Sequence, residues 1–377
     1  MNLIEQTPGL IILNIILYGV IVAILYAPFR RNHISRYAKS ISLLLILMFC
    51  TFAFWGADWF GYLYYFDVIK SGTELSTVEP IYSWIISVLS PNYIVFRLIV
   101  WGAALILLYK TIKNLELDIP YTLFFFGSIY LIWFSYARAS LSMAMMFYGL
   151  SLLHRSYKNT LFTKIIACAF IILSFYFHKS SIFGIIVIIL AELMVLFKLN
   201  KKWMIVLLLI LFPLIAHFLS LFLNIYLSSS MLDEETTLSN YMSAGVKYLM
   251  DDNNTIGIGV MIHRFFERFP YYMLAFLSCR LIFYRRPIKK NVLPFVWCLI
   301  LLILAASLFA FSSNLNTSVL YGRFIRYAQI PSCLVLTYMY SNRIYPKAIR
   351  FTYRIAVLGV VYILLYVLYN CIQAMAL

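Results

Sequence analysis

The stretch that decides the fold is LFTKIIACAFIILSFYFHKSSIFGIIVIILAELMVLFK, residues 161–198. It contains two apolar runs, 163–177 and 180–197, which a short polar turn joins. A helix needs roughly 17 to 25 such residues to cross the hydrocarbon of a bilayer. Backbone N–H and C=O groups find no water there, so each run must satisfy its hydrogen bonds internally as a helix. The stretch therefore predicts a helical hairpin in a membrane.

Similar runs recur along the whole chain. Of its 377 residues, 64% are hydrophobic and only 12% are charged, whereas soluble domains have roughly 45 to 50% apolar and about 25% charged residues. We predict an all-α, polytopic integral membrane bundle of about 12 transmembrane helices, forming a single transmembrane domain over 1–377. The predicted spans are 8–28, 40–56, 92–109, 119–135, 138–153, 163–177, 180–197, 203–222, 264–281, 292–311, 323–340 and 354–374, with a short amphipathic or re-entrant piece near 80–89.

The charges predict the orientation. If the N-terminus and the C-terminus both lie outside, 21 of the 30 lysines and arginines fall in the inner loops and 11 of the 14 acidic residues fall outside. This distribution satisfies the positive-inside rule across all the predicted spans. The net charge of +16 is then mainly a property of loops beside anionic lipid, and it gives no reason to expect a nucleic-acid partner. The long outer loop, 223–262, is compatible with either a lid or a plain surface loop.

Several cations lie on the outer side against this rule. Arg138 begins the fifth predicted helix, Arg323 and Arg326 lie one turn apart in the eleventh, and Arg264 and Arg268 lie one turn apart at the start of the ninth. Guanidinium groups match phosphate oxygens bidentately, and charges within a membrane usually face the bundle interior or a wet cavity. The pattern predicts an anion site. The alternative is that each arginine reaches lipid headgroups or pairs with an acid.

A histidine lies at the tip of the quoted hairpin. His178 stands in the turn FHKSS, 177–181, and should lie at the outer surface of the membrane. An imidazole there can accept a proton from a hydroxyl group. The alternative is an interfacial histidine with no chemical role, and His263 is a second candidate.

The first outer loop, 56–67, combines aromatic rings with carboxylates, and Glu79-Pro80-Ile81-Tyr82 follows it. Aromatic faces and carboxylate acceptors match the apolar C–H faces and hydroxyl donors of a sugar. An aromatic belt at the membrane interface uses the same residues. Asp58 and Glu79 stand apart as single acids at helix edges. The sequence shows no cluster of metal ligands, and we expect no metal and no cofactor.

These motifs, in this order, resemble the EpsG family of Wzy-like polysaccharide polymerases. The resemblance covers roughly 50–330. The matching motifs are Gly56-x-Asp58 with Tyr62 and Tyr65, Glu79-Pro80-x-Tyr82, Ser135-Tyr136-Ala137-Arg138-Ala139, Phe177-His178-Lys179-Ser180-Ser181 and Arg323-x-x-Arg326-Tyr327.

The resemblance implies a multi-pass glycosyltransferase of the bacterial inner membrane. It would join oligosaccharide repeat units carried on undecaprenyl pyrophosphate at the outer face, without a nucleotide sugar. Its further expected partners are membrane lipid and a chain-length regulator protein. The implied diphosphate ligands are Arg138, Arg323, Arg326, Arg264 and Arg268. The implied proton acceptor is His178, or else Asp58 or Glu79. The implied glycan contacts are Tyr62, Tyr65, Tyr82, Tyr327 and Lys179.

Other functions remain open on the sequence. A lipid-linked oligosaccharide flippase or transporter should show internal repeats and charged or broken helices near the midplane, and neither is evident. A membrane O-acyltransferase should not gather its polar residues at the outer ends of helices. A glycan ligase would perform nearly the same chemistry as a polymerase and is the closest rival.

Overall fold

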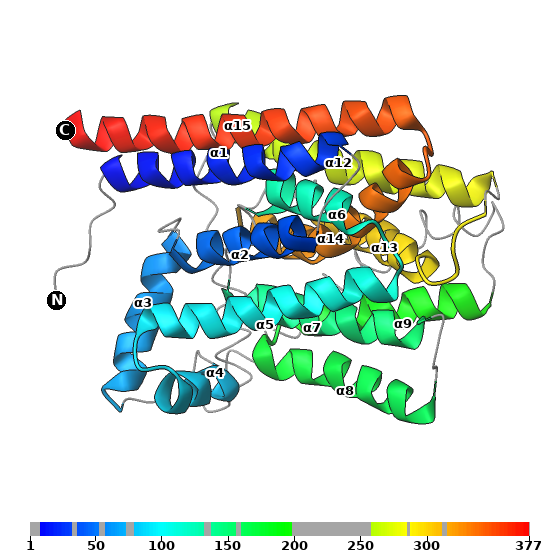
Figure 1. The fold of residues 1–377 in the computed structure, drawn as a ribbon, viewed down its shortest axis with the longest axis horizontal. Coiled ribbons are helices and arrows are strands. Elements are labelled where there is room, and N and C mark those ends of the chain that lie inside the picture. Colours follow the sequence, from blue (N-terminus) through cyan, green and yellow to red (C-terminus); the bar gives the residue numbers. More distant parts are fainter. Residues whose placement is uncertain are drawn as a thin grey trace, which may run out of the picture.

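The computed structural model describes residues 8–31, 36–52, 57–72, 79–131, 137–155, 160–197, 258–284, 287–310 and 315–376. These residues contain helices and turns and no strand (Figure 1). The elements are α1 (Pro8–Arg31), α2 (Arg36–Phe52), α3 (Ala57–Lys70), α4 (Pro80–Trp84), the π-helix η1 (Ile85–Leu89), α5 (Tyr93–Asn114), α6 (Ile119–Phe125), the π-helix η2 (Phe126–Tyr130), α7 (Ala137–Leu153), α8 (Leu161–Phe177), α9 (Ser181–Leu196), α12 (Ile258–Phe283), α13 (Leu293–Ala310), α14 (Leu315–Ser341) and α15 (Pro346–Ala376).

The helices confirm the predicted all-α fold. Wherever a predicted span lies within the described residues, a helix begins and ends within several residues of it, and α4 with η1 forms the short piece expected near 80–89. By length and apolar composition together, α5 is the one described helix long enough to cross a membrane, and eight further apolar helical segments are 10 to 17 residues long. The number of crossings and their orientation stay predictions, and 203–222 lies outside the described residues.

The first outer loop was predicted wrongly. Most of 56–67 forms helix α3, which extends to Lys70. Helical spacing sets the rings of Tyr62 and Tyr65 edge to face, with centroids 6.3 Å apart, and it turns Phe66 onto Tyr93 of α5 at 5.7 Å. Aromatic burial on one side of the segment stabilises the helix where composition alone suggested a loop. Helix α12 begins at Ile258, before the predicted end of the long loop 223–262; 223–257 lies outside the described residues, and the loop stays a prediction.

Helices α7 and α8 form an antiparallel pair. The hydroxyl of Ser142 donates to the carbonyl of Ser174 at 2.9 Å, and two turns further along α7, a Cβ on Gly149 would lie 2.7 Å from the carbonyl oxygen of Ala167. The absence of a side chain at Gly149 therefore lets the two backbones approach closely. In Figure 1, α8 lies at the lower edge of the bundle, while α1 and α15 run side by side along the upper edge.

Candidate active site

Glu79 stands at the N-terminus of α4, in extended conformation before Pro80. Proline fits the first helical position because its missing N–H would have no partner there. The Glu79 carboxylate does not cap its own helix, and the residue is only 5% exposed. An ionised carboxylate at such a depth requires hydrogen-bond donors from elsewhere in the chain.

The hairpin tip supplies these donors. Nδ1 of His178 lies 3.2 Å from Oε1 of Glu79, and the backbone N–H of Lys179 donates to the same oxygen at 3.4 Å. His178 follows the last residue of α8, and its own N–H still closes the helix on the carbonyl of Ser174. The imidazole is 24% exposed, whereas the Glu79 side chain is 6% exposed. The histidine therefore lies on the accessible side of the pair and the carboxylate lies behind it.

This geometry is suited to proton transfer. A carboxylate that accepts from Nδ1–H fixes the tautomer of the imidazole, so Nε2 presents its lone pair to a hydroxyl group. The sequence had suggested His178 and Glu79 as alternative bases. The structure brings them together as one pair, with His178 on the accessible side and Glu79 buried behind it. No group of three or more His, Cys, Asp or Glu side chains that could hold a metal lies within the part of the chain that the structure describes.

The same turn also contacts α14. The hydroxyl groups of Ser180 and Tyr327 lie 3.1 Å apart, and the rings of Phe183 and Phe324 lie 5.3 Å apart. A Cβ on Gly184 would lie 2.6 Å from Sδ of Met146 and 3.1 Å from the ring of Tyr327. The glycine thus permits α7, α9 and α14 to converge behind the hairpin tip.

These contacts determine where the predicted diphosphate ligands fall. Arg326 is partly buried next to Tyr327, and Arg323 precedes Tyr327 by one turn on the same face of α14. The register of α7 with α8, continued by one turn from Ser142, sets the backbone of Arg138 opposite that of His178. The side chains of Arg138 and Arg323 lie outside the described residues.

Of the predicted glycan contacts, Lys179 touches the pair through its backbone N–H, and Tyr82 packs behind it. Its ring is fully buried and stands edge to face with Phe177 at 5.6 Å, so it supports both Glu79 and the hairpin tip from behind. Tyr62 and Tyr65 are partly buried on α3, and Lys70 at the end of that helix donates to the carbonyl of Ser87 in η1 at 3.2 Å. Helix α3 is thereby joined to the segment that follows Glu79.

The remaining candidates are less closely tied to this centre. Asp58 lies in the first turn of α3 and Arg264 lies in α12, and both side chains are outside the described residues. Arg268 is partly buried on α12, a helix that packs along α15, where Gly359 approaches the backbone of Phe266. The roles of these residues stay predictions.

Arg97, which the predicted orientation puts on the outer side, has a structural role. Arg97 of α5 is 2% exposed, and its guanidinium donates to the carbonyl of Thr51 at 3.0 Å and to that of Cys50. These carbonyls belong to the last turn of α2, where helical partners run out. Arg97 therefore caps α2.

Sequence reasoning missed the pairings themselves. Glu79 and His178 are 99 positions apart, and no local pattern links them. It also missed a second pair, in which Nε2 of His154 lies 2.6 Å from Oε1 of Glu192. That pair lies at the end of α7 far from Arg138 and so at the other end of the bundle.

A comparison against known protein families identifies the chain. The model of the EpsG family matches residues 36–376, nearly the whole chain. Neither the curated proteins nor the solved structures contain a match. The chain belongs to the EpsG family.

Proposed function

We propose that the protein is a polysaccharide polymerase that joins oligosaccharide repeat units carried on undecaprenyl pyrophosphate at the outer face of the bacterial inner membrane. Membership of the EpsG family supports a polymerase-like role in polysaccharide biosynthesis. The observation that carries the proposal is the pair of His178 and Glu79, an accessible imidazole backed by a buried carboxylate.

In this proposal, Nε2 of His178 accepts the proton of the attacking sugar hydroxyl. The hydroxyl oxygen forms the new bond to the anomeric carbon of the donor glycan, and the bond from that carbon to the diphosphate oxygen breaks. Undecaprenyl pyrophosphate leaves with the electron pair. Glu79 stays ionised and stabilises the imidazolium that forms, which is the usual role of a carboxylate behind a catalytic histidine.

The arginines would stabilise the leaving group. Negative charge develops on the diphosphate as its bond to the sugar breaks, and cations fixed beforehand at that position lower the barrier. Arg326 and Arg323 on α14 and Arg138 on α7 belong to helices that converge at the hairpin tip. Tyr62 and Tyr65 on α3, with Lys179, would contact the sugars, and Arg264 and Arg268 would extend the cationic surface.

The length distribution of surface polysaccharide tests this proposal. Cells lacking the gene would carry wild type, His178→Ala, Arg138→Ala or Arg323→Ala at equal membrane abundance. We expect single repeat units on the surface and no ladder of longer chains from all three variants. His154→Ala is the matched control, because it removes the other carboxylate-paired histidine, and it should keep the ladder.

Three outcomes would contradict the proposal. Unchanged ladders from all three variants would mean that these side chains meet lipid headgroups and not substrate. Repeat units retained inside the cell would indicate transport of the lipid-linked glycan, and full-length chains that fail to reach their final acceptor would indicate a ligase.

A further inference from the structure

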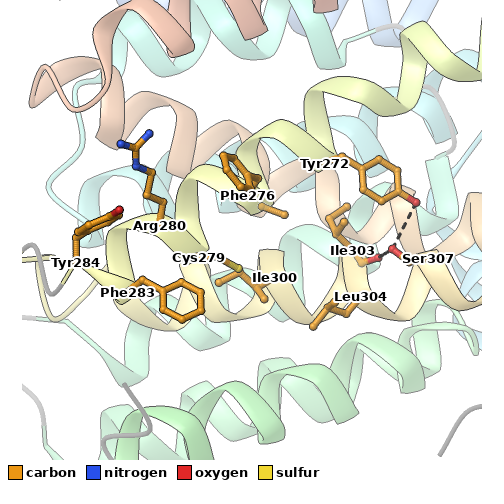
Figure 2. A pocket seen from close by; sticks show the side chains of 11 residues that line it. Tyr272, Phe276, Cys279, Arg280, Phe283, Tyr284, Ile300, Ile303, Leu304 and Ser307 are labelled. Atoms are coloured by element: carbon orange, nitrogen blue, oxygen red, sulfur yellow. Dashed lines mark hydrogen bonds between the residues drawn. The ribbon is translucent and has the colours of Figure 1, made fainter. Parts of the chain in front are cut away.

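A groove lies between α12 and α13, away from the hairpin tip. It has a volume of about 630 Å³, within the roughly 300 to 1,000 Å³ that ligand pockets usually occupy. Figure 2 shows Arg280 and Tyr284 at one end of the groove, and Tyr272 and Ser307 at the other. The side chains between these ends are mostly apolar, and Phe276 among them is 61% exposed.

The polar end is built around one guanidinium. Arg280 lies 5.5 Å from the ring centroid of Tyr284 and 5.0 Å from that of Tyr345, so aromatic faces on two elements hold it in place. Its side chain is exposed, and within the described ranges no carboxylate lies within ion-pairing distance of it. Further cations lie at this end: Arg343 and Lys347 flank Tyr345 in the chain, and Lys289 pairs with Glu116 at 3.9 Å.

The far end of the groove is weakly polar. The hydroxyl groups of Ser307 and Tyr272 lie 3.5 Å apart, and that of Ser307 also donates to its own helix at Ile303. From residue 280 to residue 272, α12 rises by about 12 Å, slightly less than half of the ~30 Å hydrocarbon thickness of a bilayer. The apolar part of the groove is therefore about as long as the hydrocarbon of one leaflet is thick.

We propose that this groove binds one anionic glycerophospholipid from the leaflet beside the basic loops. The phosphodiester would lie against Arg280 and the hydroxyl of Tyr284, and one acyl chain would run past Cys279 and Ile300 toward Tyr272. A single fixed cation matches the single negative charge of a phosphodiester. Under the proposed function, the lipid-linked substrate is not the occupant, because its diphosphate would lie at the hairpin tip at the other end of the bundle.

Native mass spectrometry on the full chain tests this site. The protein would be released from nanodiscs of equal phosphatidylglycerol and phosphatidylethanolamine, and retained lipids would be counted. We expect one phosphatidylglycerol retained preferentially. Arg280→Gln should weaken its retention about fivefold, the usual effect of one cation near an anionic lipid surface. Arg350→Gln, at the same end of the bundle but outside the groove, is the matched control and should leave retention unchanged.

The apolar part of the groove has its own test. Cys279→Phe should fill it and reduce retention, whereas Cys168→Phe, at an exposed position on α8, should not. Equal retention of both lipids, an unchanged count in Arg280→Gln, or an unchanged count in Cys279→Phe would overturn the proposal. A preference for polyprenyl phosphate over phosphatidylglycerol would overturn it as well.

Discussion

Replacing Glu79 with glutamine tests whether the buried carboxylate acts through His178. The amide keeps the volume of the side chain but removes the negative charge that faces Nδ1 at 3.2 Å. A hydrogen bond to a charged group contributes about 1.5 to 3 kcal/mol. If this hydrogen bond stabilises the transition state by that amount, its loss should lower the rate of chain growth about 10- to 100-fold. Glu79→Gln should nevertheless fold, because an amide oxygen still accepts from the N–H of Lys179.

The assay is the initial rate of chain growth in proteoliposomes that contain lipid-linked repeat units. In a protein that already carries His178→Ala, adding Glu79→Gln should lower the initial rate by less than about a further twofold. The effects of two residues that act as one unit are not additive. Glu192→Gln changes the carboxylate of the other histidine pair and is the matched control. Full activity of Glu79→Gln, or losses that multiply in the double variant, would refute the reasoning.

Three further predictions concern the packing that supports the site. Arg97→Leu leaves two carbonyls of α2 without their donor and should lower the free energy of unfolding by about 2 to 4 kcal/mol, measured by thermal unfolding in detergent. Gly184→Val should lower the free energy of unfolding by about 1 to 3 kcal/mol, because the new side chain would collide with α7 and α14. Gly102→Val is its control: no atom lies within 4 Å of the added Cβ, so the free energy of unfolding should change by less than about 0.5 kcal/mol. Tyr327→Phe removes the contact with Ser180 and should cost about 0.5 to 1.5 kcal/mol, and an unchanged melting temperature would contradict this contact.

Most of the fold could be predicted from the sequence. Long apolar runs in a membrane have almost no alternative to a helix, so the helices fell where the composition indicated. The exception was α3, since its aromatic residues suit both an interfacial loop and a helix. What decided between them was the packing of Phe66 against α5, and this contact has no local signature in the sequence.

The candidate site was predicted in its residues but not in its geometry. The motif order identified His178 and Glu79 separately, because each is a polar residue at the edge of an apolar run. That they share a hydrogen bond depends on how α4 packs against the end of α8. Arg97 shows the same limit: its charge is visible in the sequence, but the carbonyls of α2 that it caps are not.

The hairpin tip has a consequence for changes in chain length. In four consecutive positions, Phe177 packs on Tyr82, His178 and Lys179 hold Glu79, and Ser180 contacts Tyr327. One inserted residue would rotate the chain by about 100° in a helix, so these contacts could not all survive on both sides of the insertion. We therefore expect the packing of this short turn, as distinct from catalysis, to survive substitution far better than insertion or deletion.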